Sequence, residues 1–138
     1  MRHTERKGCP FCEQSGGDVV TADNELAAAF PDGFPLSEGH TLVVPKRHVS
    51  DFFQLTTDEQ EAVLEIAREV QSLLKETYEP DGFNVGINCG EAAGQTVGHA
   101  HLHVIPRFSG DVEDPRGGVR WVLPEGAEYW TRLPEEDQ

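Results

Sequence analysis

The fold is decided by the stretch Gly98-His99-Ala100-His101-Leu102-His103-Val104-Ile105-Pro106-Arg107. Its three histidines alternate with Ala100, Leu102 and Val104, and strict alternation of this kind predicts a half-buried strand. Successive side chains of a strand point to opposite faces. We therefore expect the histidines to share one face and the apolar residues to lie in the core. A row of imidazoles suits acid–base or nucleophilic chemistry near neutral pH, or metal binding, better than a solvated polar face.

Composition limits the classes of partner. The chain has 138 residues, the length of one domain with a single core, and a formal net charge of −14. That charge argues against a nucleic-acid backbone or an anionic membrane as partner. No apolar run approaches the roughly 20 residues of a membrane helix. The charged N-terminus is not followed by an apolar segment, so we expect no secretory signal and a cytoplasmic protein.

Two of the three cysteines form the motif Cys9-Pro10-Phe11-Cys12. This spacing is typical either of half a tetrahedral zinc site or of a redox pair. A redox pair usually lies between a strand and a helix, whereas no strand is expected before Cys9. We therefore favour a metal site in a tight turn, with an idle cysteine pair as the alternative.

The remaining patterns predict an α+β domain. Thr57 and Gln60 fit a capping box, and apolar residues at three-and-four spacing predict a helix of about six turns up to Tyr78. A shorter helix is expected near Val49. Lys46 and Arg47 are expected to be solvated surface charges, with steering of phosphate as the alternative. Further strands are expected at residues 19–22, 26–30, 41–44 and 83–88, with a short extra strand at 119–124.

A glycine-rich loop is expected at residues 89–98, between two antiparallel strands. Its backbone N–H groups can hold phosphate oxygens. Asn88, Gln95 and Thr96 place neutral donors beside them, which suits charge that develops on a phosphoryl group. The alternative is a flexible hairpin loop without a ligand.

The chain resembles the histidine triad (HIT) family of nucleotide hydrolases and transferases. The resemblance rests on four stretches in the expected order: Cys9 to Cys12, Gly39-His40 to His48, Asn88 with Gly94 to Val97, and the histidine stretch. It covers about residues 9–107 of a single domain, 1–138, and leaves 108–138 as a C-terminal extension. It implies a HIT-like α+β fold, with a mainly antiparallel sheet of about five strands, one long and one short helix, and a homodimer.

The resemblance also implies roles for individual residues. His101 would be the nucleophile, His103 would donate to the phosphate or bridging oxygen, and His40 would lie near the phosphates. Asp32 would contact the ribose hydroxyls, with the role of a simple turn residue as the alternative. Asn88, Gln95 and Thr96 would surround the phosphates. A closed structural zinc site would be formed by Cys9, Cys12, His48 and His99.

The function implied is hydrolysis at the α-phosphate of a purine nucleotide substrate, preferably a dinucleoside polyphosphate such as diadenosine tetraphosphate. Other variants in the family are a nucleoside phosphoramidase and a phosphorylase. A non-catalytic nucleotide-binding module is an alternative of another class. So is a metallohydrolase with its metal on His99, His101 and His103, although that arrangement would leave the two cysteines and His48 without a role.

Overall fold

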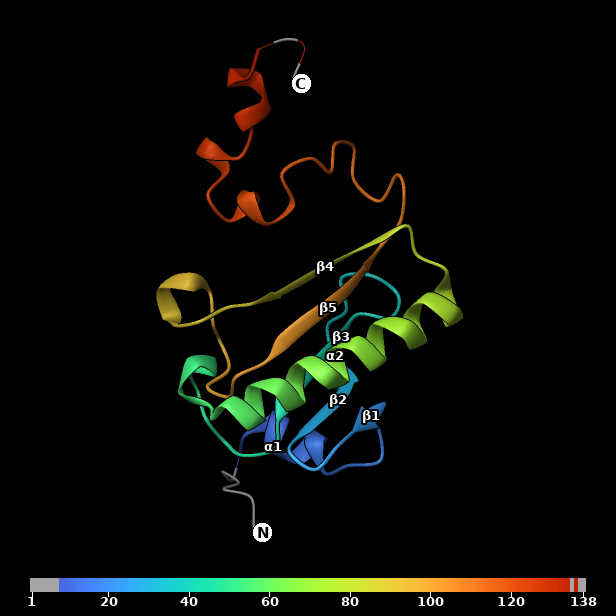
Figure 1. The fold of residues 1–138 in the computed structure, drawn as a ribbon, viewed down its shortest axis with the longest axis vertical. Helices are drawn as coiled ribbons and strands as arrows, with labels where there is room; N and C mark the ends of the chain where they lie inside the picture. The colour runs from blue at the N-terminus through green and yellow to red at the C-terminus, as the bar shows by residue number, and fades with distance from the viewer. Residues whose placement is uncertain (1–7, 135, 137–138) are drawn as a thin grey trace. The chain divides into compact units, whose positions relative to one another are not determined.

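The computed structural model describes residues 8–134 and 136 (Figure 1). It divides into two compact units, Met1–Arg107 and Phe108–Gln138. The first unit is an α+β fold around a five-stranded antiparallel sheet in the order β1-β2-β3-β5-β4. Its strands are β1 (Ala22–Asp23), β2 (Ala27–Pro31), β3 (Thr41–Pro45), β4 (Gly82–Ile87) and β5 (Leu102–Arg107). Its helices are α1 (Pro10–Ser15), α2 (Thr57–Tyr78) and the 3-10 turns η1 (Phe52–Gln54) and η2 (Glu91–Ala93).

The two faces of the sheet are covered by different helices. The long helix α2 lies across one face, as Figure 1 shows, and contacts β1, β2, β3 and β5. Its apolar stripe packs against Ala29, Val43 and Leu102. On the opposite face Phe11 and the two cysteines of α1 pack against Phe30, Leu42 and Val44. This second, smaller cluster lies on the histidine side of the sheet.

The histidine stretch follows the expected alternation. Ala100, Leu102 and Val104 are buried in the core beneath α2, while His103 pairs with Leu42 on the opposite face. The strand itself begins at Leu102, later than the alternation predicts, because the Ala100 N–H donates to the Val49 carbonyl (2.7 Å) and not to a neighbouring strand. His99 and His101 therefore lie in the segment that leads into β5.

Several local expectations were wrong. The capping box of α2 uses Thr56 and Glu59, one residue earlier than Thr57 and Gln60. The cysteine turn is a short helix, with Cys9 as its N-cap and Pro10 in its first turn. In the stretch 19–22 only Ala22 joins a strand. The short helix expected near Val49 is present, as the 3-10 turn η1.

In the second unit, the described residues form three 3-10 helices: η3 (Gly118–Val122), η4 (Pro124–Gly126) and η5 (Tyr129–Arg132). The strand expected at 119–124 was wrong, because η3 and η4 occupy that stretch. Trp130 is buried under the Arg116 guanidinium, 4.5 Å from its ring centroid. Within residues 8–134 and 136, no helix has the length and apolarity required to cross a membrane.

Candidate functional site

Four possible metal ligands meet where β5 begins. One ligand atom from each of Cys9, Cys12, His48 and His99 lies within 4.8 Å of every other. His99 Nδ1 is 3.4 Å from Cys9 Sγ and 3.5 Å from Cys12 Sγ, and His48 Nδ1 is 3.2 Å from Cys12 Sγ. A tetrahedral zinc ion with ordinary bond lengths would require sulfur–nitrogen separations of about 3.5 Å. The distances and the donor types therefore fit a tetrahedral ion.

The surroundings of His99 favour this role. Its Nε2–H donates to the Pro45 carbonyl (2.8 Å), which leaves a lone pair on Nδ1, facing the sulfurs. Burial lowers the pKa of His99, so the ring is neutral as a ligand must be. Helix α1 and its N-cap residue supply the two sulfurs, and the Cys12 N–H donates to Cys9 Sγ (3.3 Å). With two thiolates and two imidazoles, the set is closed and has the composition of a structural site.

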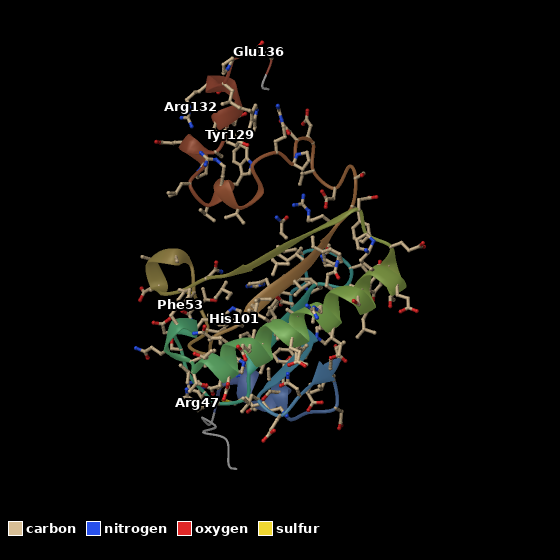
Figure 2. The ribbon with its side chains drawn as sticks, in the orientation of Figure 1. Arg47, Phe53, His101, Tyr129, Arg132 and Glu136 are labelled. Carbon is tan, nitrogen blue, oxygen red and sulfur yellow. The ribbon has the colours of Figure 1, made fainter. Side chains whose placement is uncertain are left out.

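His101 is held by the backbone of its own segment. Its Nδ1–H donates to the His99 carbonyl (2.8 Å). Because a neutral imidazole carries one proton, the lone pair of His101 is on Nε2. The side chain is buried, with the Phe11 ring edge-on at 4.9 Å and the His103 ring at 5.1 Å between centroids. Figure 2 labels His101 near the start of β5.

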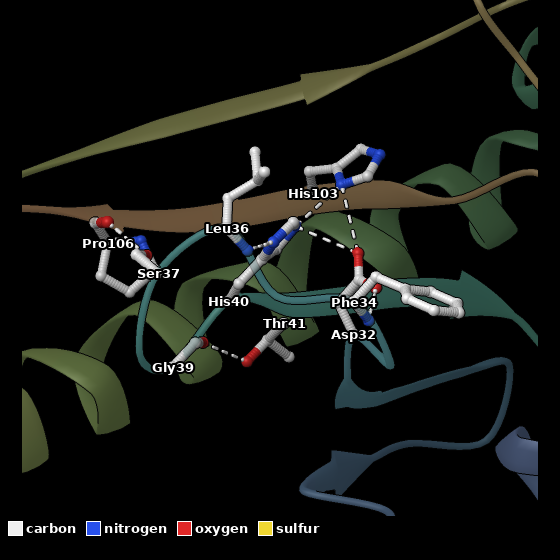
Figure 3. A network of polar contacts seen from close by, with 9 residues as sticks. All are labelled: Asp32, Phe34, Leu36, Ser37, Gly39, His40, Thr41, His103 and Pro106. Atoms are coloured by element: carbon white, nitrogen blue, oxygen red, sulfur yellow. Dashed lines mark hydrogen bonds and ion pairs between the residues drawn. The ribbon is translucent and has the colours of Figure 1, made fainter. Parts of the chain in front are cut away.

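A second group consists of Asp32, His40 and His103 (Figure 3). The Leu36 N–H donates to His40 Nδ1 (3.0 Å), so the His40 proton is on Nε2. That nitrogen lies 3.0 Å from His103 Nδ1 and 3.3 Å from Asp32 Oδ2. His103 Nδ1 therefore accepts, and the His103 proton is on Nε2. The Phe34 N–H fixes the other oxygen of Asp32 (2.8 Å).

The two histidines of this group are held in their neutral forms. Burial lowers the pKa of His40, although Asp32 opposes the shift. Burial also lowers the pKa of His103, and the neighbouring His101 and His40 lower it further. Both imidazoles can therefore stay neutral below the ordinary histidine pKa of about 6.5. Each then keeps one donor and one acceptor nitrogen.

Metal binding by the histidine stretch itself is not supported. Among the described residues, no group of possible ligands joins His99, His101 and His103. In the second group, the proton on His40 Nε2 occupies the nitrogen that would have to bind the ion. Within the described parts of the chain, the cysteine–histidine set alone brings two sulfurs and two imidazoles together, with the Nδ1 lone pair of His99 facing the sulfurs.

The loop residues proposed to bind substrate have different surroundings. The Gln95 amide is fully engaged: its oxygen accepts from Gly90 N–H (2.8 Å), and its nitrogen donates to the Ser50 and Val97 carbonyls (2.9 and 3.0 Å). Thr96 is exposed. It lines a cavity of about 400 Å³ with Gly8, Cys9, Pro10, His48, Val97 and Gly98. Asn88 is half-buried directly after β4.

The sequence interpretation missed two features of this site. Phe11 was given no role of its own, yet its ring contacts that of His101. The backbone N–H of Leu36 sets the tautomer of His40, which no side-chain motif can reveal. Lys46 and Arg47 are also not free solvated charges, because they pair with Asp23 and Glu59.

The chain has clear relatives among known proteins. It is 40% identical over 111 residues to an uncharacterized HIT-like protein of Mycoplasma genitalium, covering 78% of this chain and 79% of the relative. It is 37% identical to the asymmetrical bis(5'-nucleosyl)-tetraphosphatase of Schizosaccharomyces pombe, covering 71% of this chain and 54% of that enzyme. It is also 37% identical to the AP-4-A phosphorylase of Mycobacterium tuberculosis, covering 67% of this chain and 48% of that enzyme.

The fold has matching relatives as well. The crystal structure of a zinc-bound histidine triad family protein from Mycobacterium smegmatis superposes with a TM-score of 0.69 at 30% identity. The match covers 91% of this chain and 98% of the other. The HIT domain profile matches residues 14–110, which include β5, the second group (Asp32, His40 and His103) and the two histidines of the metal set, but not Cys9 and Cys12. On the agreement of profile, sequence relatives and fold, this chain belongs to the HIT domain family.

Proposed function

We propose that this protein hydrolyses dinucleoside polyphosphates such as diadenosine tetraphosphate, with His101 as the nucleophile. The observation that carries the proposal is the bond from His101 Nδ1–H to the His99 carbonyl, which leaves the Nε2 lone pair available for attack. A neutral imidazole held in this way is a competent nucleophile. Two relatives named for enzymes of this substrate class, the tetraphosphatase and the phosphorylase, support the choice of substrate.

In the first step, His101 Nε2 attacks the α-phosphorus and a P–N bond forms. The bond from that phosphorus to the bridging oxygen breaks, and the leaving polyphosphate departs with the electron pair as an anion. His103 donates a hydrogen bond from Nε2–H to the leaving oxygen, so it need not lose its proton. The His99 carbonyl faces the positive charge that the phosphorylated imidazole acquires.

In the second step, water attacks the same phosphorus. The P–N bond breaks, its electron pair returns to His101 Nε2, and the water proton passes to solvent as the mononucleotide leaves. His40 keeps His103 in the tautomer that donates from Nε2. This account depends on positioning and on fixed hydrogen-bond donors, which are the usual means of catalysing phosphoryl transfer.

The remaining residues would bind the substrate. Asp32 would accept from the ribose hydroxyls, and Asn88 and Thr96 would donate to phosphate oxygens. Gln95 would act indirectly, because its amide already ties Gly90 to the loop. We also propose that the protein is a cytoplasmic homodimer.

The cysteine–histidine set would hold a structural zinc ion. When bound, zinc would supply rigidity and no reacting group, since all four positions would be taken by Cys9, Cys12, His48 and His99. Because His99 is also the residue whose carbonyl holds His101, the ligands fix the start of the catalytic segment.

The test is to incubate the purified protein with diadenosine tetraphosphate and with adenosine 5′-phosphoramidate, alongside His101→Ala. Products are followed by chromatography, with and without added inorganic phosphate. Release of AMP and ATP from the tetraphosphate by wild type, and loss of release in the variant with zinc retained, is the expected result. Formation of ADP and ATP that depends on added phosphate would instead identify a phosphorylase, which the M. tuberculosis relative favours.

Other outcomes would overturn the proposal. Cleavage of the phosphoramidate alone would identify a phosphoramidase. AMP binding without cleavage of either compound would indicate a binding module. Full activity of His101→Ala would eliminate the covalent mechanism.

A further inference from the structure

We propose that Phe11 is a positioning residue for His101, holding the imidazole in the orientation that presents Nε2 to the substrate. The proposal rests on the function proposed above. Phe11 lies between the two cysteines in the sequence, and its ring contacts those of His99 and His101. Its effect would be transmitted through His101, because Phe11 has no polar group of its own to offer a phosphate.

The Phe11 ring packs against both imidazoles and against the sheet. Its ring centroid lies 4.9 Å from that of His101, with the planes inclined at 70°, and 6.2 Å from that of His99 at the same inclination. Its ring centroid also lies 5.6 Å from that of Phe30. Phe11 is 8% exposed and Phe30 is fully buried. The ring therefore fills the space between the sheet face and two imidazoles.

A packing neighbour is needed because a single hydrogen bond does not fix the plane of an imidazole ring. The bond from Nδ1–H to the His99 carbonyl holds one ring atom of His101. Rotation about the terminal side-chain torsion of histidine is broad, with two roughly equivalent ring orientations. The bond to the His99 carbonyl excludes the flipped ring, but partial rotation about the same torsion would tilt Nε2 away from the phosphorus. An edge-on aromatic neighbour restricts that rotation, and T-shaped contact is a favoured aromatic arrangement.

Phe11 is itself well anchored. It lies in α1 between Cys9, which caps the helix, and Cys12, whose N–H donates to Cys9 Sγ. Any ion held by these cysteines would also fix the position of the Phe11 ring. The metal site would then reach His101 by two routes, through the His99 backbone and through the Phe11 ring.

The test compares Phe11→Leu with Phe30→Leu as a matched control. Both substitutions replace a buried phenylalanine of the same apolar cluster, but among the described ring contacts Phe30 pairs with Phe11 and not with a histidine. The single-turnover rate and KM for diadenosine tetraphosphate are measured, together with zinc content and thermal stability. The ring signals of His101 are followed by NMR in histidine-labelled protein.

In Phe11→Leu we expect the single-turnover rate to fall about 10- to 100-fold, the loss that small misplacement of a reacting group causes. KM and zinc per chain should stay close to wild type. The His101 ring signals should shift and broaden. Phe30→Leu should lose comparable stability while keeping its rate and a sharp His101 signal. Equal rate losses in the two variants, or unchanged His101 signals in Phe11→Leu, would overturn the proposal.

The NMR comparison separates this proposal from the function on which it rests. If wild type cleaves no nucleotide, the proposed function fails. The His101 signals of the two variants still decide whether Phe11 holds that ring. If wild type is active and both variants behave alike, the function stands and Phe11 is only a core residue.

Discussion

Replacing Glu59 with glutamine should destabilise the fold, because Glu59 joins the start of α2 to the segment that carries His48. Glu59 Oε1 accepts from Thr56 N–H (2.9 Å) and from Arg47 Nη2 (2.7 Å), and Oε2 accepts from Arg47 Nε (2.8 Å). Its side chain is only 7% exposed. Glutamine keeps the shape but turns one accepting oxygen into an NH₂ group. A donor would then face a donor, whichever way the amide is placed.

The magnitude follows from the pKa of Glu59. The Arg47 guanidinium holds this pKa at about 2, against an ordinary value of 4.5. A difference of about 2.5 units corresponds to roughly 3.4 kcal/mol, which is an upper bound. Arg47 is 36% exposed, so solvent screens the pair. We expect a loss of about 2 kcal/mol and a melting temperature lower by roughly 6–10 °C.

The loss should depend on pH in a defined direction. The pKa of Glu59 is lower in the folded than in the unfolded chain, so its contribution is complete above about pH 4.5 and disappears as the pH falls towards about 2. The stability gap between wild type and Glu59→Gln should therefore narrow in acid. At about pH 3.5 it should be clearly smaller than at neutral pH.

Urea unfolding followed by circular dichroism at both pH values measures the gap. The control is Asp23→Asn, which breaks the more exposed pair with Lys46 and should cost less than about 1 kcal/mol. Equal losses from the two variants, or a gap for Glu59→Gln that does not narrow in acid, would refute the reasoning.

Three further predictions concern the site. Gly39→Ala should cost about 2 kcal/mol or more in urea unfolding, because Gly39 has φ +94° and a Cβ there would lie 2.9 Å from the Tyr78 ring. Gly86→Ala, where a Cβ meets nothing within 4 Å, should cost clearly less, and equal costs would contradict the steric argument. Cys12→Ser should abolish binding of zinc as measured by metal analysis, and a chelator should then lower the melting temperature of wild type but not of the variant. The pKa of His40 and that of His103, followed by NMR titration of their ring signals, should both lie below the ordinary histidine value of about 6.5, because burial lowers both; a value at or above 6.5 would show that the ring is not held neutral.

The sheet was predictable where one local pattern determines burial. In β5, apolar residues at Leu102 and Val104 can reach the core only if the alternating histidines face away, and the structure has this arrangement. The ends of the strand were less predictable. Its start depends on the partner of the Ala100 N–H, which is the distant Val49 carbonyl. No pattern within the stretch contains that information.

Ambiguity between neighbouring residues explains the error at α2. Both Thr56 with Glu59 and Thr57 with Gln60 fit the capping-box pattern. The structure uses the first pair, in which the buried Glu59 carboxylate also binds Arg47. Arg47, which binds Glu59 in the first pair, lies 12 residues before it and outside the capping-box pattern. The same long-range pairing is why Arg47 was mistaken for a solvated charge.

The site shows how similar residues in one motif acquire different chemistry. His99 and His101 lie two residues apart, yet His99 donates from Nε2 to Pro45 while His101 donates from Nδ1 to the His99 carbonyl. His99 therefore presents Nδ1 towards the sulfurs, and His101 keeps Nε2 for its neighbours. His103 accepts at Nδ1 from His40 and keeps a proton on Nε2.

Two of these tautomers are set by partners outside the motif, Pro45 for His99 and His40 for His103, and that of His101 is set by the motif's own backbone. A ring that offers Nδ1 as a lone pair suits a metal, one that offers Nε2 as a lone pair suits attack, and one with a proton on Nε2 suits donation. The order of residues places three imidazoles on one side of the chain. The carbonyls of Pro45 and His99 and the proton of His40 decide which nitrogen of each ring carries its proton. A change that displaces the Pro45 carbonyl or the His40 ring should therefore alter which nitrogen His99 or His103 offers, although every histidine of the motif is still present.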